Sequence, residues 1–223
     1  MDADSPQVPT APASLVEVVP DRSAQAALTR YAELLSTAGV VRGLIGPREV
    51  PRLWDRHLLN CAVVVPLVPE GSDVIDVGSG AGLPGLVWAI ARQDVSVTCL
   101  EPLQRRAAFL EEAVDELGLQ GRVRVVRARA EDIVRGRGPV TSLRARVVTA
   151  RAVAPMDRLA GWTVPLVSPG GMLLALKGRS ATEEVGAASD VLGRLGIIDV
   201  EIVVCGEGVV DPPTTVVRAT KAT

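Results

Sequence analysis

Aromatic side chains are scarce in this 223-residue chain, at 2% of the residues. Proteins that bind single-stranded nucleic acids without sequence preference stack bases on aromatic side chains, so the composition argues against that class. Cysteine is scarce as well: Cys61, Cys99 and Cys205 are odd in number, far apart and without CxxC spacing. The sequence therefore predicts neither a disulfide framework nor a zinc site, and it favours a reducing compartment.

A long apolar segment is also lacking, although the chain is hydrophobic on average. Hydrophobic residues make up 48% and charged residues 22%, and the mean hydropathy is +0.28, which supplies enough apolar material for a folded core. No apolar run approaches the roughly 20 residues that span a bilayer, and Asp2 and Asp4 stand where a signal peptide would be basic. We therefore expect a globular, cytoplasmic protein with one main domain.

The N-terminal third of the chain is predicted to be mainly helical. Residues 1–20 contain four prolines, which predicts a disordered tail. Apolar residues then recur at helical spacing over 21–41 and over 47–65, which predicts two amphipathic helices, the first capped by Asp21 or Ser23. We divide the chain into a tail (1–20), an N-terminal helical extension (21–70) and a main domain (71–223).

The main domain has short apolar runs that alternate with helical periodicity. The runs predict strands at 73–77, 95–100, 123–126, 147–150 and 171–176. Helices are predicted over 86–91, 103–117 and 185–195, and a final antiparallel pair over 202–204 and 215–218. This alternation is typical of the α/β class, with a doubly wound, mainly parallel sheet covered on both faces.

A glycine-rich loop follows the first predicted strand. It reads DVGSGAG over residues 76–82, and Gly78 and Gly80 allow the backbone to turn sharply and to approach a ligand closely. Glu101 comes 19 residues after Gly82, at the end of the next strand, where its carboxylate can accept both hydroxyls of an adenosine ribose. Strand, loop, helix, strand and acid together indicate a nucleotide-containing cofactor.

The loop spacing bears on which cofactor this is. A dinucleotide fingerprint needs GxGxxG, whereas this loop reads GxGxG. Asp76 would repel a pyrophosphate but suits a cationic, amino-acid-bearing cofactor such as S-adenosylmethionine. Alternatively, the glycines form only a tight turn and Asp76 caps a neighbouring helix. After the third strand, Ala130 and Glu131 are placed to bracket an adenine, or simply to begin a helix.

Four segments then follow in order within residues 50–180: RHLL (56–59), IDVGSGAGLPG (75–85), ARAVA (150–154) and LKG (176–178). In these segments the chain resembles the RsmG (GidB) family, bacterial methyltransferases that modify N7 of a guanine in small-subunit ribosomal RNA. The GxGxGLPG loop with the later ARA and LKG segments is much more specific than a generic methyltransferase loop. The resemblance implies a class I methyltransferase with a Rossmann-like sheet, which uses S-adenosylmethionine and acts on 16S ribosomal RNA or the 30S subunit.

The resemblance also implies site residues. Gly78 and Leu83 match the family's loop contacts, the pair 130–131 matches the residues beside the adenine, and Arg151 matches the arginine that lines the cofactor and substrate cleft. Glu101 stands where many members have Asp, which keeps the carboxylate, and Asn60 stands where Asp would be expected after RHLL. The expected cofactor-binding residues are Gly78, Gly80, Leu83, Glu101, Ala130, Glu131 and Arg151, with Arg151 as the catalytic residue and no metal.

The chemistry that this implies makes few demands on side chains. Guanine N7 already exposes a lone pair, so methyl transfer needs alignment rather than a general base. Arg151 is expected at the end of a strand, where doubly wound sheets bind ligands, with a structural ion pair as the alternative. Lys177 is a weaker candidate of the same kind. His57 is the only histidine, and we expect it to be a packed or helix-capping residue rather than one that acts directly in function.

Arginine outnumbers lysine strongly, since Lys177 and Lys221 are the only lysines among 24 basic residues. Residues 122–151 hold nine arginines and two acids, which predicts a phosphate-binding patch, although a solvated strand face explains any single arginine as well. The target guanine should lie in a loop, because the major groove of A-form RNA is too deep and narrow for side chains. We expect a monomer without membrane contact. Open alternatives are another RNA or small-molecule methyltransferase, a dinucleotide-binding oxidoreductase and a non-catalytic nucleotide-binding module.

Overall fold

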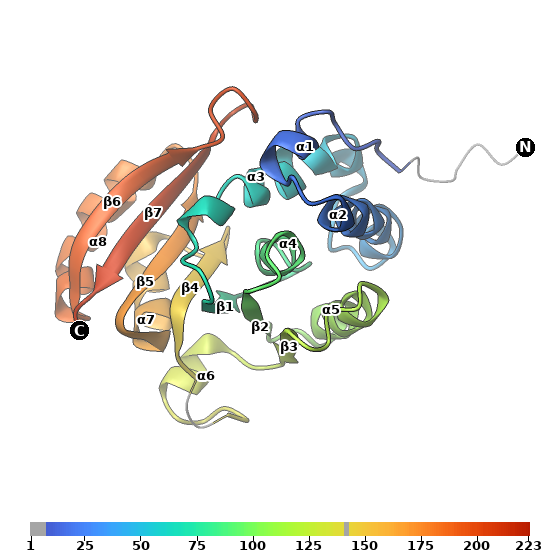
Figure 1. Cartoon of the computed structure of the whole chain (residues 1–223). Coiled ribbons are helices and arrows are strands. Elements are labelled where there is room, and N and C mark those ends of the chain that lie inside the picture. Colours follow the sequence, from blue (N-terminus) through green and yellow to red (C-terminus); the bar gives the residue numbers. More distant parts are fainter. Residues whose placement is uncertain (1–7, 141–142) are drawn as a thin grey trace, which may run out of the picture.

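The computed structural model describes residues 8–140 and 143–223. At its centre is a seven-stranded sheet with the order β3-β2-β1-β4-β5-β7-β6 (Figure 1). The strands are β1 (Asp73–Val77), β2 (Ser96–Leu100), β3 (Val123–Val126), β4 (Ala145–Arg151), β5 (Val167–Lys177), β6 (Ile197–Cys205) and β7 (Thr214–Lys221). The first five strands are parallel, and β7 runs antiparallel between β5 and β6. The predicted doubly wound sheet with an antiparallel C-terminal pair is confirmed.

The central strands form because their side chains are buried on both faces of the sheet. In β1, Val74, Ile75 and Val77 are at most 2% exposed, and branched side chains of this kind pack well on a pleated surface. The strands predicted at 73–77 and 123–126 have the observed bounds. Both β4 and β5 are longer than predicted.

Helices cover both faces of the sheet and form two hydrophobic clusters. The first face carries α4 (Gly85–Ala91) and α5 (Gln104–Glu116) together with the N-terminal helices. The second carries α6 (Ala130–Val134), α7 (Met156–Thr163), a short 3-10 turn η5 (Val164–Leu166) and α8 (Ala181–Arg194). In Figure 1, α7 and α8 lie behind the strands β4 to β7. Helix α7 was not predicted from the sequence.

The N-terminal extension packs into the same cluster as the first face of the sheet. It begins with α1 (Leu15–Val18) and α2 (Arg22–Leu34), and α2 continues into a π-helical turn, η1 (Leu35–Gly39). Asp21 caps α2, since its carboxylate accepts the Ala24 N–H at 2.8 Å. The predicted cap and first helix are therefore confirmed.

The prediction of a disordered tail is wrong for residues 8–20. Leu15 and Val19 are 4% and 3% exposed, and the Trp54 indole N–H donates to the Pro9 carbonyl at 2.9 Å. The prolines interrupt regular structure, but the apolar residues between them bury enough surface to fix this segment against the core. Residues 1–7 of the predicted tail lie outside the described residues.

The second predicted helix, over 47–65, is broken into short pieces. It consists of a 3-10 segment η2 (Pro47–Arg52), a π-helical turn η3 (Trp54–Leu58), α3 (Leu59–Ala62) and a 3-10 turn η4 (Val65–Leu67). Pro51 lies inside η2 and has no N–H to donate, which prevents a regular α-helix there. The changes of pitch bring Glu49 and His57 within contact, with 3.2 Å between Oε2 and Nε2.

The next features concern the cysteines, metal-ligating clusters and membrane-spanning helices of the described residues. Cys61, Cys99 and Cys205 are all buried and free. Within 8–140 and 143–223, no three His, Cys, Asp or Glu side chains gather as a metal site would need. In the same residues no helix combines the length and the apolar character that crossing a membrane takes.

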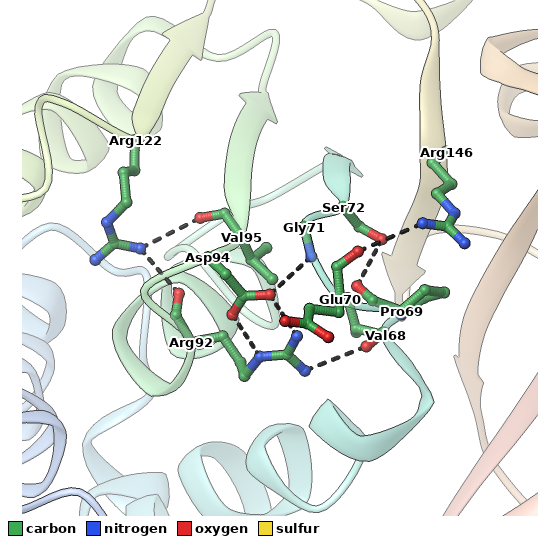
Figure 2. A network of polar contacts seen from close by, with 10 residues as sticks. All are labelled: Val68, Pro69, Glu70, Gly71, Ser72, Arg92, Asp94, Val95, Arg122 and Arg146. Carbon is green, nitrogen blue, oxygen red and sulfur yellow. Dashed lines mark hydrogen bonds and ion pairs between the residues drawn. The ribbon is translucent and has the colours of Figure 1, made fainter.

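A polar network closes the edge of the sheet at which the parallel strands begin, here called the amino edge (Figure 2). Arg92 pairs with Asp94 through Nε and Nη2 at 2.7 and 2.6 Å, and Asp94 also accepts the Gly71 N–H at 2.8 Å. One Nη of Arg122 is shared at 2.7 to 3.2 Å by the carbonyls of Ala89, Arg92 and Val95. These arginines tie the loops before β1, β2 and β3 together.

Candidate active site

Two adjoining cavities lie at the opposite edge, where the parallel strands end, here called the carboxyl edge. The glycine-loop cavity has a volume of about 480 Å³ and is lined by the loop after β1 and by the end of β2. The Lys177 cavity has a volume of about 770 Å³ and lies between the ends of β4 and β5 and the helices η2 and η3. The two cavities share a wall formed by His57, Arg151, Ala152 and Val153. This edge, beside the switch point between β1 and β4, is where doubly wound sheets bind ligands.

The glycine loop presents bare backbone to its cavity. Gly78 and Gly80 have φ angles of +70° and +58°, which glycine adopts without steric cost. A Cβ added at Gly78 would meet Val153 Cγ2 at 2.9 Å, so a side chain there would collide with the shared wall. The buried Tyr31 hydroxyl of α2 donates to the Ala81 carbonyl at 2.5 Å and holds the loop from below. Gly78, Gly80 and Leu83 all line the cavity, and their contact with a cofactor stays a prediction.

Glu101 is 1% exposed and follows directly after β2. Its Oε2 accepts the Gly80 N–H at 2.9 Å, and its Oε1 accepts the Leu103 N–H at 3.0 Å. Each carboxylate oxygen has a second lone pair, so both can still accept a hydroxyl from a ligand. The structure thus brings the predicted carboxylate to the glycine loop and aligns it through that loop.

Asp76 lies beneath the loop and lines neither cavity. Its carboxylate is fully buried, and Oδ2 accepts the Gly85 N–H at 3.0 Å. Burial raises the pKa of Asp76 to about 7, against the lowering effect of the Gly85 N–H. The suitability of Asp76 for a cationic cofactor stays a prediction, whereas its bond to Gly85, the first residue of α4, fits the alternative of a helix cap.

The predicted adenine contacts lie beside the glycine-loop cavity. Arg129 lines the cavity, and Ala130 and Glu131 begin α6 directly after it. Neither residue of this pair is part of the lining, so their contact with an adenine stays a prediction. The acidic first turn also suits the positive end of the helix, as the alternative interpretation has it.

Arg106 also lines the glycine-loop cavity and was missed in the sequence. Its Nε is buried and finds no hydrogen-bond partner among the described residues. A buried donor of this kind costs free energy unless a ligand satisfies it. The sequence signal that could have indicated Arg106 as a site residue is its position. It lies in the first turn of α5, five residues after Glu101 and at the same edge of the sheet.

Arg151 ends β4 in the wall between the cavities. Its Nη1 donates to the Arg56 carbonyl at 3.3 Å, and its Nη2 lies 2.9 Å from His57 Nδ1. The Arg56 carbonyl and the His57 imidazole both accept hydrogen bonds from Arg151, but neither carries a negative charge. The contact therefore differs from the structural ion pair that was the alternative role for Arg151. The sequence did not suggest that His57 meets Arg151.

Lys177 has a different role from Arg151. Its Nζ pairs with Glu184 Oε2 at 2.7 Å and donates to the Ala154 carbonyl at 2.7 Å, and its side chain is only 9% exposed. The bond to Lys177 lowers the pKa of Glu184. Ala152, in the same segment, has a φ of +54°, which is unfavourable for a residue with a Cβ. Lys177 therefore lines its cavity but mainly holds the strained segment after β4.

The arginine-rich stretch 122–151 is divided between the two edges of the sheet. Arg122, Arg124 and Arg144 lie around a separate hollow at the amino edge, beside the first residues of β1 and β2. Arg129 and Arg151 line the glycine-loop cavity at the carboxyl edge. The prediction of one continuous phosphate-binding patch is therefore wrong, because β3 and β4 carry the chain from one edge to the other.

Comparisons with known proteins cover both the N-terminal helices and the sheet. Residues 24–212 match the GidB family, described as rRNA small subunit methyltransferase G. A protein named Ribosomal RNA small subunit methyltransferase G from Salinispora tropica is 63% identical over 188 residues, which are 84% of this chain and 78% of that protein. A protein of the same name from Streptomyces avermitilis is 56% identical over 215 residues, 96% of this chain and 87% of that protein.

Solved structures share the fold at low sequence identity. The O-methyltransferase from Bacillus cereus, in complex with SAH, aligns with a TM-score of 0.58 at 12% identity over 93% of this chain and 94% of its own. An O-methyltransferase family protein from Burkholderia thailandensis gives 0.58 at 15% identity over 88% of this chain and 63% of its own. At these identities the likeness concerns the fold alone, which is that of the class I methyltransferases.

Proposed function

The chain belongs to the GidB family, rRNA small subunit methyltransferase G, and on that premise we propose that it transfers the methyl group of S-adenosylmethionine to N7 of a guanine in 16S ribosomal RNA. The observation that carries the proposal is the pair of adjoining cavities that His57, Arg151, Ala152 and Val153 line in common. One cavity has the glycine loop and the buried carboxylate that suit a nucleoside-containing donor, and the other has room for a base. Methyl transfer needs this adjacency, because donor and acceptor atoms must meet in line.

S-adenosylmethionine fits the glycine-loop cavity on three observations. The loop offers bare backbone at Gly78, the Glu101 carboxylate has lone pairs to spare, and the Arg106 Nε is buried without a partner among the described residues. We assign the loop contacts to Gly78, Gly80 and Leu83, the ribose hydroxyls to Glu101, and the adenine to the pair 130–131. When bound, the cofactor supplies an electrophilic methyl group on a sulfonium.

The acceptor base belongs in the Lys177 cavity. Leu176, Pro212 and Pro213 supply apolar surface there on which a ring can lie. Arg151 reaches both cavities and cannot accept a proton, so its part is to orient base and cofactor through hydrogen bonds. No side chain needs to remove a proton, because N7 of guanine is unprotonated at neutral pH and already exposes its lone pair.

Exposed arginines flank the two cavities and support an RNA substrate. Arg56 and Arg179 line the Lys177 cavity, and Arg129 lines the glycine-loop cavity. Their charge suits phosphates on either side of a base that is turned into the site. The proposal extends to the 30S subunit as partner, with the enzyme acting as a monomer in the cytoplasm.

Tritium transfer from labelled S-adenosylmethionine tests the proposal. Unmethylated 30S subunits, naked 16S RNA and a mixture of small-molecule acceptors are offered in parallel, and the labelled RNA is cleaved chemically at N7-methylguanine. We expect label in RNA and cleavage at one guanine. Label only in small molecules, or in RNA at another atom, would overturn the proposal. A cofactor titration with NAD in place of S-adenosylmethionine tests the oxidoreductase alternative.

A further inference from the structure

Three side chains from three elements form a hydrogen-bonded chain that ends at the shared wall. Arg151 ends β4, His57 lies in η3, and Glu49 lies in η2. Arg151 Nη2 lies 2.9 Å from His57 Nδ1, and His57 Nε2 lies 3.2 Å from Glu49 Oε2. The His57 side chain is 17% exposed and borders both cavities. The chain thus runs from a carboxylate at the rim of the Lys177 cavity to the guanidinium in the wall.

The donor and acceptor roles in this chain follow from the guanidinium. Arginine has only donors, so His57 Nδ1 must present a lone pair to Nη2. A neutral imidazole then carries its proton on Nε2, which donates to the Glu49 carboxylate. Only one tautomer of neutral His57 satisfies both contacts, and the doubly protonated ring satisfies only the contact to Glu49.

We propose that His57 and Glu49 are positioning residues that orient Arg151 for methyl transfer, and that protonation of His57 releases the arginine from this orientation. The proposal rests on the proposed function, in which Arg151 aligns base and cofactor. The Arg56 carbonyl, which accepts from Nη1 at 3.3 Å, supplies the second fixed point of the guanidinium. With two of its nitrogens held from the side of η3, the planar group has a defined orientation toward both cavities.

The surroundings of His57 set the direction of its pH dependence. The charged groups that act on it are Arg151 from β4, Glu49 from η2 and Arg56 from its own helix. Burial, followed by the charge of Arg151, lowers the pKa of His57 below its ordinary value of 6.5, against the raising effect of Glu49. The neutral ring, and with it the bond to Arg151, is therefore present at neutral pH. Both are lost as the pH falls through the lowered pKa of His57.

The first experiment needs no substrate, so its failure is distinct from failure of the proposed function. His57 is the only histidine, so labelling with ¹⁵N-histidine gives one imidazole whose tautomer and titration are read directly by NMR. We expect the proton on Nε2 at neutral pH, a raised His57 pKa in Arg151→Met, and a lowered one in Glu49→Gln. A proton on Nδ1, or a titration that neither substitution moves, would overturn the proposal.

The second experiment separates positioning from packing. In His57→Asn, the amide oxygen lies near the position of Nδ1 and can still accept from Arg151, whereas His57→Leu keeps the bulk but offers no acceptor. In the wild type we expect the rate of methyl transfer to fall at acid pH as His57 is protonated; this fall is the acid limb of the pH profile. We expect His57→Asn to retain substantial methyl transfer to 30S subunits and to lack this acid limb. His57→Leu should lose at least tenfold in kcat at an unchanged melting temperature. Equal activity of both variants, or an acid limb that persists in His57→Asn, would contradict the positioning role.

Discussion

Arginine is used in opposite ways at the two edges of the sheet. At the amino edge, one Nη of Arg122 serves three carbonyls. Arg92 is paired with Asp94 (Figure 2), so donors of both arginines are used within the chain. At the carboxyl edge, Arg151 contacts one carbonyl and one imidazole, and Arg106 has a buried Nε without a partner among the described residues. Donors that the fold has already used stabilise it, whereas donors left over at a cavity can bind a ligand.

The carboxylates of the two edges show the same contrast. Asp94 and Glu101 each accept a glycine N–H, from Gly71 at 2.8 Å and from Gly80 at 2.9 Å. Both carboxylate oxygens of Asp94 also accept hydrogen bonds from Arg92, and this pairing lowers the pKa of Asp94. Glu101 is buried at a cavity, and within residues 8–140 and 143–223 its hydrogen-bond donors are the backbone N–H groups of Gly80 and Leu103 rather than an arginine. The same local motif therefore fixes a loop at one edge and prepares a binding site at the other.

The largest effect is expected from a side chain in the glycine loop. Gly78 and Gly71 have φ angles of +70° and +65°, and asparagine tolerates this region better than most residues. In Gly78→Asn the new side chain would collide with Val153 in the cavity lining and cover the backbone that a ligand must approach, so binding of S-adenosylmethionine should be abolished. Gly71→Asn is the matched control, because a Cβ there meets nothing within 4 Å. Calorimetry on both folded variants measures the affinity for S-adenosylmethionine. Normal affinity in Gly78→Asn would show that the cofactor does not bind at the glycine loop.

The next largest effect is expected at Glu101. Removing a charged hydrogen-bond acceptor costs about 1.5–3 kcal/mol, so Glu101→Ala should weaken binding of S-adenosylmethionine roughly 10- to 150-fold. Asp94→Ala, which removes the corresponding carboxylate at the amino edge, should leave the affinity unchanged. A cofactor titration of both variants compares the two edges directly. Equal losses in the two would show that Glu101 acts only on loop structure.

A smaller effect, on stability rather than binding, is expected at the amino edge. Arg122→Met keeps much of the side-chain volume but leaves three carbonyls without their donor, which should lower the free energy of unfolding by roughly 1–3 kcal/mol. Urea denaturation measures this loss, and calorimetry on the folded variant should return the wild-type cofactor affinity. If affinity fell and stability did not, Arg122 would belong with the binding arginines.

The smallest effect is expected where the N-terminal extension supports the glycine loop. Tyr31→Phe removes the bond to the Ala81 carbonyl, which should lower the free energy of unfolding by about 1 kcal/mol and weaken cofactor binding only a few-fold. Thermal melting and calorimetry measure the two quantities. An unchanged melting temperature would mean that the extension packs on the loop without anchoring it through this bond.

The sheet and the glycine loop could be predicted from the sequence because their signals are local. Strands buried on both faces read as short apolar runs, and the loop with Glu101 follows a fixed spacing along the chain. The missed helix α7 has its buried residues at helical spacing, but it is only eight residues long and contains Gly161, so its local signal is short. The prolines of residues 1–20 predict a disordered tail, whereas Leu15 and Val19 are buried in the tertiary structure.

The rest of the site depends on contacts between distant segments. Arg151 and His57 are 94 residues apart, and nothing in the sequence near either residue indicates that they meet. The charge of the arginine-rich stretch, counted along the chain, predicts one patch, but the fold places its residues at two edges of the sheet. At about 3.3 Å per residue, a strand such as β4 separates the residues at its two ends by roughly 20 Å, so Arg144 and Arg151 cannot share a patch.

The most direct test of this account measures methyl transfer to 30S subunits and the melting temperature of Arg151→Met and Arg122→Met side by side. We expect Arg151→Met to keep its melting temperature and lose methyl transfer, with little recovery in Arg151→Lys because the planar fork is gone. Arg122→Met should melt lower and keep its activity per folded molecule. Full methylation by correctly folded Arg151→Met protein would contradict the account.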